Sequence, residues 1–236
     1  MRAAHMVLDG EPKILNDTVV PRLMGATAVE SLKTRAVEFD SDAARGLRTH
    51  VILRSRFAED RLAEAVADRR IEQCINLGAG GDTFAYRQPE WAKGICVTEV
   101  DHPASQAGKR ERLAAAGFAI PPNVSYAPID LETSTLRDGL IANRVDLTVP
   151  TVFSWLGVTM YLTEAAIDEV LHTIIGFPSG TEVVLTFARR KRPARDGVGG
   201  PSLAERAASI GEPWLSYFEP DEIDAKLRAF GFSDVY

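Results

Sequence analysis

The chain has 236 residues, of which 45% are hydrophobic and 25% are charged. These proportions are those of a globular protein with a sizeable core, and they exclude a disordered, collagen-like or coiled-coil chain. The formal net charge of −6 at pH 7 argues against nucleic acid or an anionic membrane as the main partner and favours a small molecule or a protein.

Residues 1–41 are expected to form a helical segment that acts as a lid over the substrate site, ahead of a main domain over residues 42–236. Charged side chains recur through the first thirteen positions, which lack the apolar core of a secretory signal. The longest largely apolar stretch, residues 147–162, is shorter than the roughly 18 to 20 residues that cross a bilayer. We therefore expect a cytoplasmic protein with no membrane partner.

A long helix is predicted over residues 42–69. Helical spacing places Leu47, Val51, Ala58 and Leu62 on one stripe, and Arg54 lies on the same stripe. An arginine that points inward needs an anion, whereas one at the edge of the stripe can lay its stem along apolar surface with its charge in water. Periodicity alone leaves both interpretations open.

Beyond residue 70 the chain alternates short β-rich runs with helical patterns. That alternation is typical of an α/β fold with a mostly parallel sheet and helices on both faces. The runs expected to form strands are residues 71–77, 95–100, 124–129, 151–156, 182–188 and 232–236.

Start and stop residues delimit three helices between these strands. Proline suits a first helical turn, threonine caps a helix start, and glycine accepts the left-handed conformation at a helix end. The delimiting pairs are Pro103 with Gly117, Thr163 with Gly176, and Pro220 with Gly231.

The first predicted strand runs into a turn of small residues, Gly78-Ala79-Gly80-Gly81, where a ligand can approach the backbone closely. The next strand ends about twenty residues later at Asp101, where a carboxylate can accept both hydroxyls of a ribose. The turn and the acidic residue together favour a cofactor that contains a nucleoside.

Asp82 argues against a dinucleotide as that cofactor. A pyrophosphate would bind at the start of the helix after the turn, where Asp82 has the wrong charge. S-adenosylmethionine has no phosphate, and it carries an ammonium group that suits Asp82 and a carboxylate that suits Arg54. A Rossmann-type oxidoreductase stays the competing function, and helix capping stays the alternative role for Asp82.

Four ordered motifs resemble the leucine carboxyl methyltransferase family, including its bacterial branch of S-adenosylmethionine-dependent methyltransferases. The motifs are residues 77–83 with Tyr86-Arg87, residues 99–103 with Lys109, residues 129–131, and residues 160–162. The resemblance runs from about Arg54 to Tyr236. It implies a class I methyltransferase fold with S-adenosyl-L-methionine as the cofactor.

The resemblance also implies roles for individual residues. Arg54 would hold the cofactor carboxylate, and the turn of Gly78, Ala79 and Gly80 would surround the methionine part. The ribose would contact Asp101 beside His102, and the adenine edge would contact Asp130 with Leu131.

Two features depart from the family pattern. Leu156 stands where many members have a glutamate, so we expect a more apolar wall where the cofactor and the substrate meet. The family's sheet ordinarily finishes with an antiparallel hairpin, and this chain ends at the first strand of that hairpin.

The expected activity is O-methylation of a small-molecule carboxylate or hydroxyl, as in secondary metabolism. A carboxylate is favoured because it is already ionised and needs no general base. A phenol or alcohol would need one, and His102 and Tyr161 are the candidates. A module that binds the cofactor without turnover is the remaining alternative.

Metal and hydrolase chemistry are not expected. The four histidines and two cysteines lack metal-ligand spacing, each cysteine is expected to be a buried apolar residue, and no G-x-S-x-G elbow occurs. Residues 189–215 are expected to be a mobile insertion whose basic residues are either solvated or attract an anionic substrate.

Overall fold

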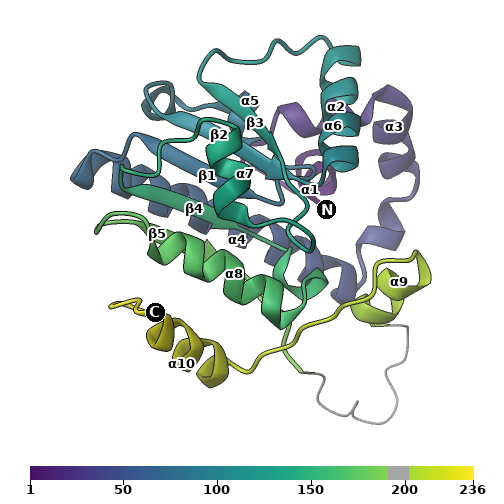
Figure 1. Cartoon of the computed structure of the whole chain (residues 1–236). Coiled ribbons are helices and arrows are strands. Elements are labelled where there is room, and N and C mark those ends of the chain that lie inside the picture. Colours follow the sequence, from purple (N-terminus) through teal and green to yellow (C-terminus); the bar gives the residue numbers. More distant parts are fainter. Residues whose placement is uncertain (191–201) are drawn as a thin grey trace.

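A five-stranded parallel sheet forms the centre of the protein in the computed structural model, which describes residues 1–190 and 202–236 (Figure 1). The strand order is β3-β2-β1-β4-β5. The strands are β1 (Gln73–Leu77), β2 (Cys96–Asp101), β3 (Val124–Pro128), β4 (Thr151–Trp155) and β5 (Glu182–Leu185). Five of the six expected strands are therefore confirmed.

The central strand β1 shows why this segment is buried on both sides. Its residues pair in parallel with β2, where Ile75 faces Thr98, and with β4, where Ile75 faces Phe153. Successive side chains point to opposite faces, so Ile75 and Leu77 enter one core cluster and Cys74 enters the other. Hydrophobic residues at successive positions are what a strand covered on both faces requires.

The helices follow the predicted order. They are α1 (Arg2–Leu8), α2 (Val19–Met24), α3 (Ala26–Thr34), η1 (Ala36–Phe39), α4 (Asp42–Arg69), α5 (Phe84–Arg87), η2 (Glu90–Ala92), α6 (Pro103–Ala115), α7 (Leu136–Ala142), η3 (Thr159–Tyr161), α8 (Glu164–Ile175), α9 (Leu203–Ser209) and α10 (Pro220–Phe230). The Thr163 hydroxyl accepts the Ala166 N–H at 3.2 Å and Gly231 ends α10 with φ of +107°, as expected, whereas Gly176 ends α8 in the right-handed region with φ of −76°. Among the described helices none has the length and apolar character needed to cross a bilayer.

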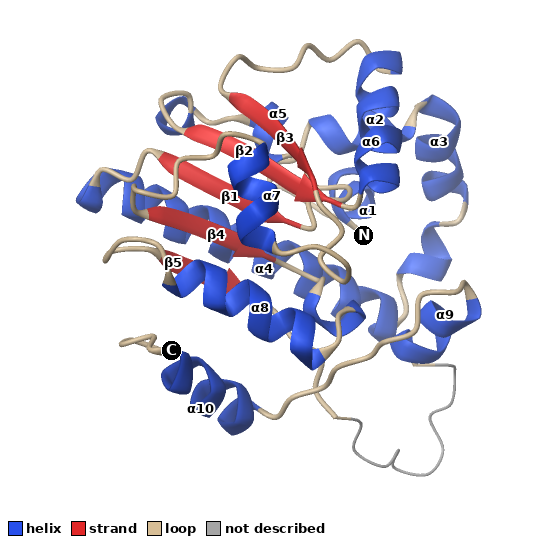
Figure 2. Cartoon of the chain, viewed as in Figure 1, coloured by secondary structure: helices blue, strands red, loops and turns tan. Residues whose placement is uncertain are grey.

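The sheet lies between two helical layers (Figure 2). One core cluster joins it to α7, α8 and α10 and includes Phe153 and Trp155. The other joins it to α4 and α5 and includes Leu62 and Phe84. Both faces of the sheet are therefore covered, as in the class I methyltransferase fold.

The N-terminal helices form a small cluster of their own beside α4. Ala3, Ala4 and Leu32 are its buried members. In Figure 2, α1 lies beyond the arrowheads of β2 and β3, that is, at the carboxyl end of the sheet. This position puts the N-terminal segment where parallel sheets bind ligands.

The expectation of a strand over residues 232–236 is wrong. These residues are irregular, and the carbonyls of Ser233 and Val235 accept hydrogen bonds from Arg228 at 3.4 and 3.3 Å. A strand needs a neighbouring strand to pair with, whereas here a side chain satisfies the carbonyls.

Two smaller expectations also need correction. The buried stripe of α4 continues from Ala58 through Ser55 and Ile52 to Arg48, while the expected Leu47 and Val51 are only half-buried. The helix is turned so that Val51 faces a cavity instead of the core. Cys74 is buried as expected, but Cys96 is exposed because it begins β2 with its side chain directed outward.

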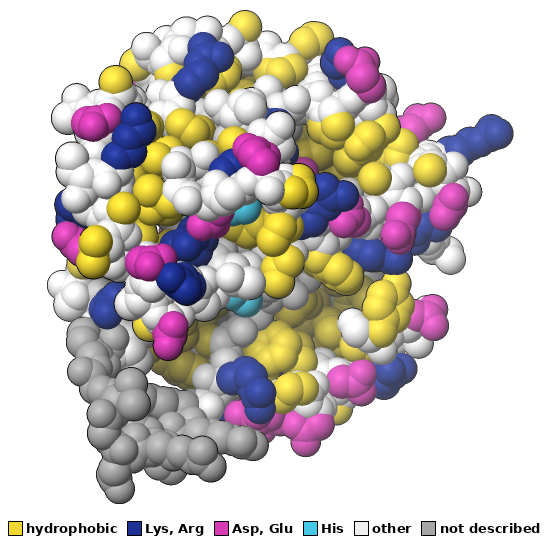
Figure 3. Space-filling model, turned by 180° about the vertical axis from the view of Figure 1, so that it is seen from behind, with side chains coloured by type: hydrophobic (Ala, Val, Ile, Leu, Met, Phe, Trp, Pro, Cys, Tyr) yellow, Lys and Arg dark blue, Asp and Glu magenta, His cyan; other side chains and the backbone are white. Residues whose placement is uncertain are grey.

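Charges of both signs are interspersed over the face shown in Figure 3. Several charged side chains of the protein pair locally along a helix, for example Arg56 with Asp60 at 2.8 Å and Arg61 with Glu64 at 2.7 Å. Positive charge is thus not gathered into one surface on this face.

Candidate functional site

A cavity of about 470 Å³ lies at the carboxyl end of β1 and β4. The strand order reverses between these two strands, which is where open parallel sheets bind ligands. The volume is within the range of small-molecule sites. Its lining residues are Met1, Arg2, Ala3, Val20, Met24, Val51, Arg54, Ser55, Asn76, Gly78, Ala79, Gly80, Gly81, Asp82, Leu156 and Gly157.

The predicted glycine turn forms one wall of this cavity. Gly78 has φ of +66° and Gly80 has φ of +41°, so both lie in the region that favours glycine. A side chain at Gly78 would also collide with Val158, since a Cβ atom there would lie 2.3 Å from Cγ2. The N–H groups of Gly78 and Ala79 both donate to the Val100 carbonyl, at 2.8 and 3.0 Å. The turn therefore folds across the end of β2.

Asp101 lies directly against this turn. Its carboxylate accepts a hydrogen bond from the Gly80 N–H and another from the His102 N–H at 2.8 Å. Gly80 lines the cavity, so the Asp101 carboxylate is held at the edge of the cavity. The predicted turn and Asp101 are therefore in direct contact at this edge of the sheet.

Arg54 reaches the cavity from α4 without an acidic partner. Its Nε atom is buried and makes no hydrogen bond to any described residue. The guanidinium packs on the backbone of Gly157, where a Cβ atom would come within 2.6 Å of it. Burial lowers the Arg54 pKa, and the neighbouring positive charge of Arg2 lowers it further. A half-buried cation with an unused donor is matched to an anionic ligand.

Asp82 has both carboxylate oxygens engaged. One accepts the Phe84 N–H at 2.8 Å, as in a helix cap, and the other pairs with Arg2 at 2.6 Å. Burial opposes the ionisation of Asp82, but Arg2, Lys109 and the Phe84 N–H outweigh it and lower the pKa to about 2. Asp82 is thus a fixed negative charge in the cavity wall.

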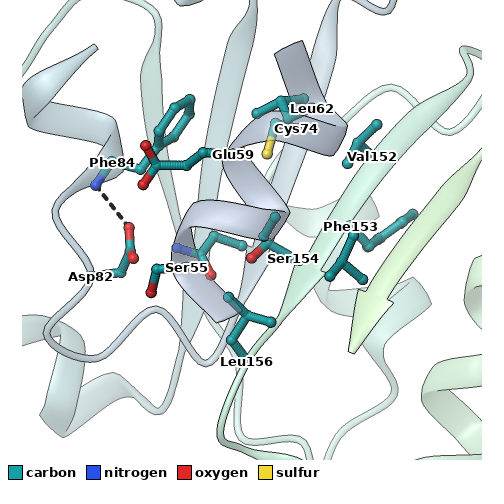
Figure 4. Close-up of a pocket in the computed structure, with 13 residues that line it drawn as sticks. Ser55, Glu59, Leu62, Cys74, Asp82, Phe84, Val152, Phe153, Ser154 and Leu156 are labelled. Carbon is teal, nitrogen blue, oxygen red and sulfur yellow. Dashed lines mark hydrogen bonds between the residues drawn. The ribbon is translucent and has the colours of Figure 1, made fainter. Parts of the chain in front are cut away.

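Figure 4 shows Asp82 beside a smaller cavity of about 20 Å³ between α4 and the sheet. Ser55 and Glu59 reach it from α4, Ser154 from β4, and Leu156 from the segment after β4. Leu156 lines both cavities, as do Ser55, Asn76 and Asp82, and it contributes an apolar side chain to the lining of the 470 Å³ cavity.

The N-terminal segment is held to this site by a buried chain of charges. Asp17 is fully buried, pairs with Arg2 at 3.0 Å and accepts the Thr83 hydroxyl at 2.7 Å. Arg87 in turn pairs with Glu59 of α4 and donates to Thr83. These contacts fix Arg2 and the start of α5 in the cavity wall.

The remaining predicted site residues lie outside the lining of the large cavity. The His102 ring is exposed and accepts the Ala104 N–H at 3.2 Å, which caps α6. The Asp130 carboxylate accepts hydrogen bonds from residues 132 and 133 of its own turn, and Leu131 belongs to a core cluster. Tyr161 is half-buried in η3 and lies near enough to Arg54 to act on its charge.

Several lining residues carry no sequence signal of a site. Arg2, Val20 and Met24 come from the N-terminal segment, far from the glycine turn in the chain. Gly157, two residues after the end of β4, does fit a general rule that points to a ligand.

The basic insertion is partly described. Arg189 pairs with Glu219 at 2.9 Å, and Arg190 pairs with Glu222. Two of its positive charges are therefore already balanced at the start of α10. Of the insertion expected over residues 189–215, residues 202–215 are described and include helix α9, whereas Lys191, Arg192 and Arg195 lie outside the described residues.

Known proteins resemble this chain in sequence. The sequence model of the family described as leucine carboxyl methyltransferase matches residues 1–175. A Bacillus subtilis protein named "Putative S-adenosyl-L-methionine-dependent methyltransferase YktD" is 32% identical over 68% of this chain, and the match spans 53% of that relative. A Mycolicibacterium vanbaalenii protein with the same description is 31% identical over 89% of this chain and spans 70% of the relative.

Solved structures resemble its fold. A Thermobifida fusca protein described as a "putative methyltransferase" gives a TM-score of 0.54 at 23% identity and covers 90% of this chain and 78% of its own. A Streptomyces avermitilis protein of the duf574 family gives a TM-score of 0.52 at 16% identity, over 73% of this chain and 67% of its own.

Proposed function

Because the chain belongs to the leucine carboxyl methyltransferase family, we propose that it is an S-adenosyl-L-methionine-dependent O-methyltransferase whose acceptor is a carboxylate of a small molecule. The observation that carries the proposal is Arg54: a half-buried guanidinium, without an acidic partner among the described residues, that faces a cavity of about 470 Å³ beside a glycine turn.

The residues present fit the cofactor group by group. Arg54 offers unused N–H donors to the cofactor carboxylate, and the fixed charge of Asp82 suits the ammonium. Asp101 has its carboxylate held at the edge of the cavity and suits the ribose hydroxyls. Asp130 and Leu131 follow β3 on the same edge of the sheet and are assigned to the adenine.

S-adenosylmethionine supplies a methyl group on a positively charged sulfur, which a nucleophile displaces in line. The contribution of the protein is to hold the acceptor on that line, and alignment of this kind is worth roughly 7 to 11 kcal/mol. The N-terminal segment supports such alignment because Arg2, Val20 and Met24 line the cavity together with residues that follow the strands.

The side chains of the cavity favour an acceptor that is already ionised. Among the described lining side chains, those with acid–base groups are Arg2, Arg54 and Asp82. Asp82 is paired with Arg2, and its lowered pKa makes it a poor base near neutral pH. His102 is engaged in capping α6. A carboxylate acceptor needs no proton to be removed, so it fits this lining better than a phenol or an alcohol.

The proposal is tested by calorimetry with S-adenosylmethionine and with NAD, followed by methyl-transfer assays across small carboxylic acids and matched phenols. We expect binding of S-adenosylmethionine alone and esters as products. Binding of NAD would support the oxidoreductase alternative. Cofactor binding without transfer to any acid or phenol would support a module without catalytic activity.

A further inference from the structure

A buried cluster of polar side chains lies beneath the turn that carries Asp101. Glu99 is fully buried in β2, and its carboxylate pairs with Lys109 of α6 at 2.7 Å. The second carboxylate oxygen accepts the Tyr86 hydroxyl of α5 at 3.0 Å, and that hydroxyl lies 2.9 Å from the hydroxyl of Tyr126. Lys109 also lies 5.3 Å above the ring of Tyr86. We call Glu99, Lys109 and Tyr86 the β2 cluster.

The β2 cluster joins three elements that meet at the candidate cofactor site. Tyr86 belongs to α5, which directly follows the glycine turn. Lys109 belongs to α6, which directly follows Asp101 and His102, and Gln106 of the same helix donates to the backbone carbonyl of Glu99 at 2.9 Å. Glu99 therefore connects helices α5 and α6. The Asp101–Gly80 hydrogen bond connects the two turns that precede these helices.

The alternation of side chains along β2 explains how one strand carries both the buried Glu99 and Asp101 at the edge of the cavity. Glu99 and Asp101 are two residues apart, so their side chains point to the same face of the sheet. Glu99 lies within the strand and is covered by α5 and α6, while Asp101 ends the strand at the cavity. A shift of Glu99 would therefore be transmitted to Asp101 through a short, hydrogen-bonded stretch of backbone.

Stability alone does not account for such a cluster. Moving a carboxylate and an ammonium out of water costs about as much as their attraction returns, and apolar replacements of buried ion pairs are often neutral or stabilising. What a fully bonded polar cluster supplies is one defined geometry. Precise placement is what a carboxylate that binds two ribose hydroxyls needs.

We propose that the β2 cluster is a positioning device that sets the Asp101 carboxylate and the glycine turn for the nucleoside part of the cofactor. The inference rests on the proposed function and assigns to Glu99, Lys109 and Tyr86 a role without direct contact with the cofactor. The cluster acts on binding of the adenosine part, while the alignment of the methyl acceptor depends on other residues.

The test compares the wild type with three variants. The double variant Glu99→Gln with Lys109→Met removes both charges together, so neither is left buried without a partner. Tyr86→Phe removes only the hydroxyl that donates a hydrogen bond to Glu99. Glu182→Gln is the matched control, because Glu182 pairs with Arg61 and Arg69 at the opposite, amino end of the sheet. Folding of each variant is verified by circular dichroism and urea unfolding.

The readout is calorimetric affinity for adenosine and for S-adenosylmethionine, with kcat and KM for the best acceptor. We expect the double variant to bind adenosine and the cofactor about tenfold more weakly and Tyr86→Phe about threefold more weakly, the losses expected when hydrogen bonds to charged groups are misaligned. At saturating cofactor we expect kcat to stay within about threefold of the wild type. The control should keep wild-type affinity whatever its loss of stability.

The failures are distinguishable. A folded double variant with wild-type affinity for adenosine would show that the β2 cluster is only structural. If the double variant does not fold, Tyr86→Phe decides, and unchanged affinity in that variant overturns the inference. A wild-type protein that does not bind S-adenosylmethionine would overturn the proposed function itself.

Discussion

Replacing Arg54 should weaken binding of the cofactor and should stabilise the protein in the absence of the cofactor. We expect Arg54→Met to keep the apolar stem along the cavity wall while it removes a half-buried charge whose Nε has no partner among the described residues. Because an unpaired buried polar group costs about 1 to 3 kcal/mol and Arg54 is only partly buried, we expect a gain of about 1 kcal/mol in the free energy of unfolding.

Cofactor binding should change in the opposite direction. Hydrogen bonds to a charged group contribute about 1.5 to 3 kcal/mol, which corresponds to an affinity for S-adenosylmethionine that is roughly 13- to 160-fold weaker. The affinity is measured by calorimetry with S-adenosylmethionine and S-adenosylhomocysteine, and the stability by urea unfolding without ligand. Opposite signs in the two measurements are what a residue retained for binding produces.

Arg56→Met is the matched control for this experiment. Arg56 lies on the same helix, is exposed, and pairs with Asp60 at 2.8 Å. An exposed pair of this kind contributes less than about 1 kcal/mol, so stability should change little and affinity should stay at the wild-type value. A loss of stability in Arg54→Met with unchanged affinity would refute the argument, because Arg54 would then be a packing residue without an anionic ligand.

Further predictions address the same site. Gly157→Ala should cost about 1 to 2 kcal/mol of stability from its φ of +76° and should displace the Arg54 guanidinium, so unfolding and cofactor affinity should both worsen; an effect on stability alone would contradict the contact. Asp101→Ala should weaken the binding of adenosine as well as that of the whole cofactor, and an unchanged affinity for adenosine would rule out the ribose assignment. Asp82 has a folded pKa lowered to about 2 from its ordinary 3.8, so its contribution to stability is present above pH 3.8 and is lost as pH falls towards 2; Asp82→Asn should reduce the acid dependence of urea unfolding in that window. With a carboxylate acceptor the rate at saturation should stay nearly flat from about pH 6 to 9, whereas a rise of about tenfold per pH unit would indicate a phenol. Leu156→Glu should weaken binding of the acceptor more than binding of the cofactor. A larger loss of cofactor affinity in calorimetry would show that the residue faces the cofactor.

Local patterns in the sequence were sufficient for much of the fold. The five strands of the sheet were expected within three residues of their observed ends, because continuous apolar runs bounded by glycine, proline and polar residues mark strands buried on both faces. The contact between the glycine turn and Asp101 was expected for a similar reason. Parallel strands bring their carboxyl ends to one edge of the sheet, so residues that follow neighbouring strands meet there.

The predictions that were wrong concern elements whose structure depends on what pairs with them or packs against them. Residues 232–236 have the composition of a strand, but the carbonyls of Ser233 and Val235 accept hydrogen bonds from the Arg228 side chain. For α4, the periodicity located a buried stripe, but the rotation that buries Ile52 and leaves Val51 at the cavity depends on the surfaces packed against the helix.

Contacts between distant parts of the chain were decided by the tertiary structure alone. The pairing of Arg2 with Asp82 joins residues eighty positions apart, and no spacing rule connects them. The assembly of Glu99, Lys109 and Tyr86 around one carboxylate likewise depends on how α5 and α6 pack on β2. The sequence by itself determined the five strands of the sheet, helices α4, α6, α8 and α10, and the position of the glycine turn, because these depend on local backbone preference and periodicity. Only the tertiary structure decided which charges are paired and that Arg54 faces a cavity without an acidic partner among the described residues, because burial and distance are properties of the folded chain.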